Sequence, residues 1–106
     1  MKGFGEIGKL MKIQSEIARL QEELEARRIE ASSGGGMVRA VMNGHGELVE
    51  LEIDPQVVNP QEVEMLQDLI LAAVSEAKRR TQEMVREEMS KIVPAGLMGK
   101  IPGLIT

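Results

Sequence analysis

The stretch GGGMVRAVMNGHGELVELEIDP, residues 34–55, decides how the middle of this 106-residue chain folds. It opens with three contiguous glycines, and glycine-rich loops often bind phosphate. A nucleoside-triphosphate loop also needs a Lys followed by Ser or Thr, and a dinucleotide loop opens a helix. Neither pattern follows here, because residues 37–42 are strand-like instead. The stretch therefore does not predict a nucleotide site.

The same stretch predicts a β-hairpin. Asn43-Gly44 is a strong turn signal, since Gly accepts positive φ and Asn tolerates it, and Gly46 adds a second permissive position. Residues 47–53 alternate between polar and apolar side chains, which predicts a strand with one buried face and one solvent-exposed face. The predicted apolar face comprises Val38, Ala40 and Met42 on the first strand and Val49, Leu51 and Ile53 on the second.

Two long helices are predicted around this hairpin. Over residues 6–28 the apolar positions step by three and four, as in a heptad seam. These positions are Leu10, Ile13, Ile17, Leu20 and Leu24. One interpretation is that the seam packs on the chain's own second helix, and the other is that part of it packs on another copy of the chain. We expect both kinds of packing.

The second helix has clear start and stop signals. Asn59 is a favoured N-cap, Pro60 a favoured first helical residue, and Glu62 completes a pattern like a capping box. Its expected buried face carries Leu66, Ile70, Ala73, Ala77, Met84 and Val85. Pro94 and Gly96 predict that it ends near residue 93.

The linkers complete the predicted fold. Residues 27–32 form a short first strand, and residues 34–36 serve as its flexible connection to the hairpin. The expectation is an α+β fold with a long N-terminal helix, a three-stranded antiparallel sheet and a long C-terminal helix. Residues 1–93 make one domain, and residues 94–106 make a flexible tail rich in Gly and Pro.

Composition excludes several classes of function. The chain has no Cys, which excludes disulfides and thiol nucleophiles, and its one histidine, His45, falls in the predicted turn. No nucleophile–base pair can be assembled, so we predict no enzyme, no catalytic or metal-binding residue, no cofactor and no small-molecule substrate. No apolar run is long enough for a membrane span, and no signal-peptide core is present, so a soluble cytoplasmic protein is expected.

The ordered set of segments resembles the YbaB/EbfC family of bacterial nucleoid-associated proteins over nearly the whole chain. The segments that carry the resemblance are GKLMKIQSEIARLQEELEA, then the hairpin stretch, then EVEMLQDLILAAVSEAKRRTQEM and the Gly-Pro tail. The resemblance implies a tweezers-like homodimer whose sheets meet at its centre. It also implies cytoplasmic, nucleoid-associated binding of double-stranded DNA with little sequence selectivity and no catalysis.

Short basic clusters are the candidate DNA contacts, although the net charge is -4. The candidates are Lys78, Arg79 and Arg80 on the second helix, Lys9, Lys12 and Arg19 on the first, and Lys2 in the glycine-rich arm that precedes it. Lys78, Arg79 and Arg80 lie where similar proteins carry a basic group. Such side chains can pair with phosphate oxygens. The competing interpretation is that Glu76 and Glu83 hold the two arginines in surface ion pairs.

A function of another class also fits these helices. A protein-interaction adaptor, or a module like a co-chaperone, would use its heptad helices to dock a protein partner. DNA binding predicts an affinity for DNA that falls steeply with salt. The adaptor function predicts instead a persistently exposed apolar patch that captures a protein.

Overall fold

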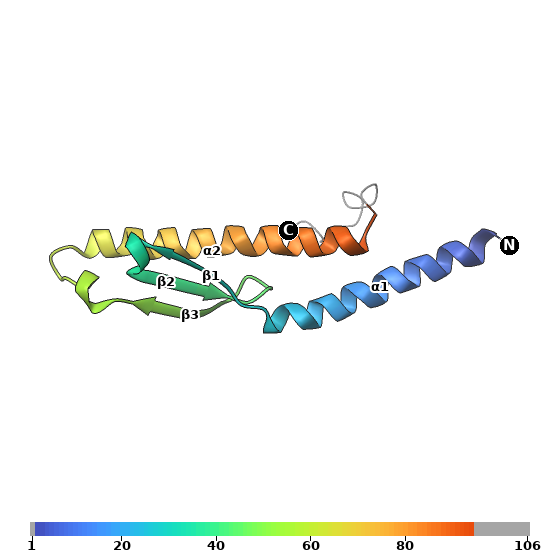
Figure 1. Cartoon of the computed structure of the whole chain (residues 1–106), viewed down its shortest axis with the longest axis horizontal. Helices are drawn as coiled ribbons and strands as arrows, with labels where there is room; N and C mark the ends of the chain where they lie inside the picture. Colours follow the sequence, from blue (N-terminus) through green and yellow to red (C-terminus); the bar gives the residue numbers. More distant parts are fainter. Residues whose placement is uncertain (1, 95–106) are drawn as a thin grey trace.

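The computed structural model describes residues 2–94, with side chains from residue 5 onward. Two long helices enclose a three-stranded antiparallel sheet of order β1-β2-β3 (Figure 1). The elements are α1 (Lys2–Ala26), β1 (Ile29–Ser33), β2 (Val38–Met42), β3 (Leu48–Ile53) and α2 (Val63–Ile92), with 3₁₀ turns η1 (Gly34–Gly36) and η2 (Pro55–Val57). The predicted α+β fold is therefore confirmed.

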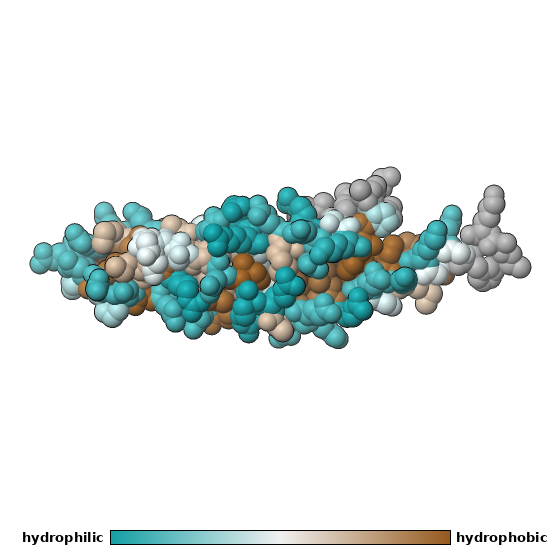
Figure 2. Space-filling model, viewed as in Figure 1, coloured by the Kyte–Doolittle hydropathy of each residue, from teal (hydrophilic) through white to brown (hydrophobic). Residues whose placement is uncertain are grey.

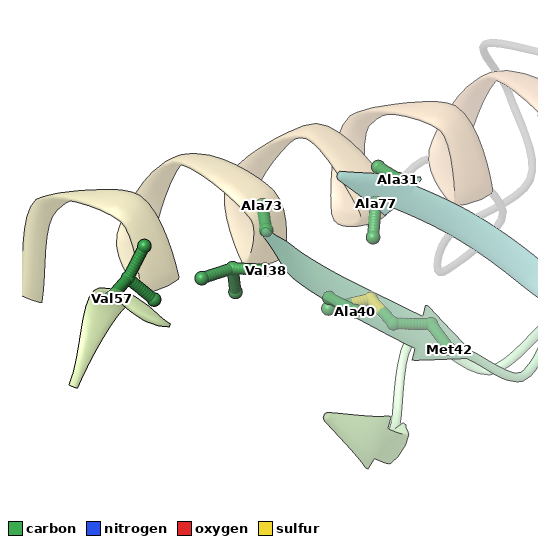
Figure 3. Packing of buried hydrophobic residues seen from close by; sticks show 7 residues of the cluster. All are labelled: Ala31, Val38, Ala40, Met42, Val57, Ala73 and Ala77. Atoms are coloured by element: carbon green, nitrogen blue, oxygen red, sulfur yellow. The ribbon is translucent and has the colours of Figure 1, made fainter. Parts of the chain in front are cut away.

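Helix α2 packs across one face of the sheet and forms the main core there. Ala73 and Ala77 are fully buried, and their small side chains let the helix backbone approach the strands closely. Val38 and Ala40 meet them from β2 (Figure 3). The cluster comprises Ala31, Val38, Ala40, Met42, Val57, Ala73 and Ala77.

Strand β3 lies at the edge of the sheet, beyond the cover of α2. Leu51 pairs with Ala40 and therefore shares the sheet face that α2 packs on. It nevertheless remains 38% exposed, and Leu48 and Val49 are more exposed still. A bulge beside Met42 pairs that residue with Leu48. The predicted burial of the apolar face thus holds for β2, but it is wrong for most of β3 within one chain.

The hairpin turn is clamped to the end of α1. Asn43 is buried, and its side-chain oxygen accepts hydrogen bonds from the backbone N–H groups of His45 and Glu47. The N–H of Gly44 donates to the carbonyl of Leu24 at 2.7 Å, close to the end of α1, where the same carbonyl accepts from the N–H of Arg27 at 3.2 Å. A turn at the predicted position is confirmed, but the positive φ occurs at Gly46 and not at Asn43 or Gly44. The turn also fixes where α1 leaves the sheet.

Only part of the heptad seam is covered. Leu20 and Leu24 pack with Met89 of α2 in a second buried cluster. Towards the N-terminus, by contrast, Leu10 is 56% exposed and Met11 is 62% exposed. Packing of the seam on the chain's own second helix is therefore confirmed for the C-terminal half of α1.

Several predicted boundaries differ from the structure. Asn59 does not cap α2: its side chain accepts from the N–H of Gln61 in a local turn, and Glu62 has non-helical φ and ψ, so α2 begins at Val63. The predicted connection at residues 34–36 forms the short turn η1, in which all three glycines have positive φ. The predicted tail lies outside the described residues, except for Pro94.

Candidate nucleic-acid interface

Basic residues from both helices meet at the end of the molecule that is distant from the sheet. Lys9 and Lys12 are three residues apart on α1 and so lie on the same side of the helix. They line a shallow groove of about 330 Å³ together with Lys91, from the last turn of α2. Ile13 and Ile92 add apolar lining to this groove. The carboxylate of Glu16 also lines the groove, so three ammonium groups face one carboxylate there. This excess of positive charge makes a site that phosphate oxygens can approach.

The sequence predicts Lys9 and Lys12 as DNA contacts but gives no signal for Lys91. An isolated lysine near the end of a helix carries no signal of its own, and only the meeting of α1 with α2 places it beside the others. Its ammonium group lies 3.3 Å from the carboxylate of Glu88, in an exposed i,i+3 pair. Such exposed pairs are weak and exchange readily for another anion.

The predicted cluster at residues 78–80 is less compact than its sequence suggests. Successive residues on an α-helix point about 100° apart, so these three side chains leave α2 in different directions. Arg80 reaches back to the sheet, where it donates to the backbone carbonyl of Glu30 at 2.9 Å. It therefore ties α2 to β1 as well as carrying a charge.

Arg79 is held by two carboxylates, as the competing interpretation predicted. Its guanidinium donates to both carboxylate oxygens of Glu76, at 3.1 Å from Nε, and to Glu83 at 2.6 Å. The hydrogen bond from Arg79 lowers the pKa of Glu76, and Glu76 in turn raises the pKa of Arg79. Within residues 2–94, Lys78 forms no such ion pair. Lys78 is therefore the member of this cluster best placed to meet a phosphate.

The two remaining candidates are separate from both groups. Arg19 is exposed on α1 and lies 3.8 Å from Glu23, so it contributes little net positive charge of its own. The side chain of Lys2 lies outside the described ones. The distance along α2 from Lys78 to Lys91 is about 20 Å, at about 1.5 Å per residue. The structure thus separates the predicted contacts into a groove group and a mid-helix group.

The open face of the sheet has the opposite charge. Arg39 lies there among three carboxylates, and it donates to Glu52 at 2.8 Å, to Glu50 at 3.0 Å and to Glu30. The hydrogen bond from Arg39 lowers the pKa of Glu52, while that carboxylate raises the pKa of Arg39. One guanidinium among three carboxylates leaves a net negative surface, which repels phosphate. This face of the sheet is therefore a poor site for phosphate.

No group of three or more His, Cys, Asp or Glu side chains in residues 2–94 is arranged to hold a metal ion. His45 is exposed in the turn, as predicted. No helix in the part of the chain that the structure describes is long and apolar enough to cross a membrane.

Known proteins resemble this chain along most of its length. A family model described as the YbaB/EbfC DNA-binding family matches residues 1–97. A nucleoid-associated protein from Moorella thermoacetica is 56% identical, with 85% of this chain and 90% of the relative covered. One from Syntrophobacter fumaroxidans is 48% identical, with 97% and 91% covered.

A solved structure has the same fold. The crystal structure of an uncharacterized protein from Helicobacter pylori superposes with a TM-score of 0.71 at 29% sequence identity. The match covers 82% of this chain and 91% of that one.

Proposed function

Because the chain belongs to the YbaB/EbfC DNA-binding family, we propose that it binds double-stranded DNA as a nucleoid-associated homodimer without enzymatic activity. The related proteins from Moorella thermoacetica and Syntrophobacter fumaroxidans are named nucleoid-associated, which supports that location. Binding is mainly to phosphates and has low sequence specificity.

The observation that carries this proposal is the basic groove between α1 and α2. Lys9, Lys12 and Lys91 line it on an exposed surface, and they outnumber its one carboxylate, Glu16. Lysine ammonium groups on flexible stems bind phosphate as point charges and read no base edges. The chain has no Tyr or Trp that could stack on bases, and one Phe, so single-strand binding by aromatic stacking is disfavoured. Affinity then comes mainly from released counterions.

An uncovered apolar surface supports the homodimer. Leu48, Val49 and Leu51 on β3 are all more than a third exposed. Leu71 of α2, at 64% exposed, lies nine residues before Arg80 and therefore on the opposite side of the helix. Since Arg80 contacts β1, Leu71 points away from β1 and is largely open to solvent.

Two copies that pack by this β3–α2 face would bring their sheets together at the centre of the dimer. The α1 arms, with their lysines, would then project from the outside like tweezers. The dimer would present each basic group twice, so two weak sites would act together along one duplex.

The homodimer predicts that Leu71→Asp gives a single-chain particle. The substitution places a charge in the proposed interface, where it has no partner, while the helix itself tolerates it on an exposed position. Light scattering at micromolar concentration should report twice the chain mass of 11.6 kDa for the wild type and one chain mass for the variant. Ala72→Asp is the matched control, because it adds the same charge one residue away on the other flank and should remain dimeric. A wild type with the mass of one chain would contradict the proposal.

Fluorescence anisotropy of a labelled duplex tests DNA binding directly. Titrations at about 50 and 200 mM salt should show an affinity that falls at least tenfold, because phosphate contacts release counterions. Duplexes of different sequence should give similar affinities. No binding at the lower salt would overturn the proposal. The exposed Ile7, Leu10 and Met11 of α1 would then favour the protein-interaction adaptor instead.

A further inference from the structure

Helix α1 extends beyond the end of α2, and its apolar stripe continues without a partner. Ile17, Leu20 and Leu24 pack around Met89 and Ile92, which belong to the last turns of α2. Further towards the N-terminus, the stripe is open to solvent: Ile7 is 54% exposed, Leu10 is 56% and Met11 is 62%. Figure 2 shows apolar surface, in brown, where α1 meets the C-terminal end of α2.

The groove between the two helices lies where this uncovered stripe begins. Its apolar lining is Ile13 and Ile92, both half-buried. Pro94 also lines it, and this is the last residue that the structure describes. The following segment, residues 95–106, therefore starts at the edge of the groove.

The sequence of that segment fits an apolar groove with a basic rim. Its apolar side chains are Leu97, Met98, Ile101, Leu104 and Ile105. It contains no Asp or Glu and a single charge, Lys100, so nothing in it competes for the lysines of the rim.

The segment is also long enough to cover the stripe. From Ile13 to Ile7 the distance along α1 is about 9 Å, at about 1.5 Å per residue. An extended chain covers about 3.3 Å per residue, so the first few residues after Pro94 span that distance.

We propose that residues 95–106 dock as an apolar strap in the groove of their own chain, against Ile13, Ile92 and the exposed stripe around Leu10. A second copy of the chain is the competing occupant. A segment tethered at the groove edge has an effective concentration of about millimolar at this site, whereas the second copy in the proposed dimer packs by the β3–α2 face, away from this groove. The tether therefore favours the chain's own tail.

This strap affects the proposed function by its position. It fills the apolar floor and leaves Lys9 and Lys12 at the rim, so it stiffens the arm that carries them. The consequence for DNA rests on the proposed DNA binding, but the docking itself does not. Docking by apolar contacts should also be insensitive to salt, unlike phosphate binding.

Paramagnetic broadening tests the strap without any DNA. Because the chain has no Cys, Gly103→Cys gives a single site for a nitroxide label. Amide signals of residues 7–13 and of Ile92 should lose most of their intensity in the labelled chain, at low and at high salt. Undiminished signals there would overturn the proposal.

Mixed samples and tail variants identify the occupant and the contacts. In a second sample, nitroxide-labelled chains are mixed with isotope-labelled chains that carry no nitroxide. The amide signals of the isotope-labelled chains should keep their intensity. Broadening of these signals would show that the tail docks on a second copy, and it would overturn the proposal. Ile101→Asp combined with Leu104→Asp should abolish the broadening. The matched control, Gly99→Asp with Thr106→Asp, adds the same charge, spares the apolar residues and should retain it. If both double variants behave alike, apolar docking is overturned.

Discussion

Replacing Gly44 with alanine should lower the free energy of unfolding by about 1–3 kcal/mol, the usual cost of overpacking a filled site. A Cβ at this position would lie 2.7 Å from the Cβ, the Cδ2 and the backbone oxygen of Leu24. The backbone oxygen cannot rotate away as a side chain can. The turn and the end of α1 must therefore separate, and the 2.7 Å hydrogen bond from the N–H of Gly44 to that oxygen must lengthen.

Thermal unfolding followed by circular dichroism measures this effect. For a domain of this size, each kcal/mol lost corresponds to about 4–8 °C in Tm. Gly8→Ala is the control: a Cβ there has no atom within 4 Å, and alanine favours the helix, so Tm should stay or rise slightly. Equal Tm values for Gly44→Ala and the wild type would show that the turn does not clamp α1.

Removing both charges from the α1 side of the groove should cause the largest loss of DNA binding. In the variant Lys9→Gln with Lys12→Gln, each chain loses two proposed phosphate contacts, and a dimer loses four. Each contact contributes about 0.9 to the slope of log affinity against log salt. The slope should therefore become shallower by roughly two to four, with at least a tenfold weaker affinity at low salt.

Anisotropy titrations over a salt series measure that slope. Lys9→Arg with Lys12→Arg is the matched control, because it keeps both charges and should retain most of the binding. An unchanged slope in the Gln variant would show that the DNA-binding surface lies outside the groove. Lys78 would then be the next residue to replace, since Arg79 is paired with Glu76 and Glu83 and Arg80 also ties α2 to β1.

The local structure of the middle of the chain could be predicted because its signals act over neighbouring residues. Asn43-Gly44 favours a turn by backbone preference, and alternation over β3 follows from the period of a strand. The same reasoning failed at Asn59, where two local options compete. An Asn side chain can cap a helix or close a short turn, and here it accepts from Gln61 in a turn.

The candidate site was predictable only in part. Lys9 and Lys12 are close in sequence and share a side of α1, so spacing alone grouped them. Lys91 is far from them in sequence, and only the contact between the two helices brings it to the same groove. Conversely, the run at 78–80 looks like one cluster in the sequence, but the helical turn of about 100° per residue separates it.

By itself, the sequence determined the order of elements, the hairpin and the amphipathic faces, because backbone preferences and hydrophobic periodicity are properties of short segments. Only the tertiary structure decided which apolar faces are covered. Helix α2 lies over β1 and β2, so the apolar residues of β3 stay exposed, and it ends at Ile92, so the N-terminal half of α1 extends past it (Figure 1). Coverage depends on the lengths and directions of elements distant in sequence, and those are fixed by contacts such as that of Gly44 with Leu24.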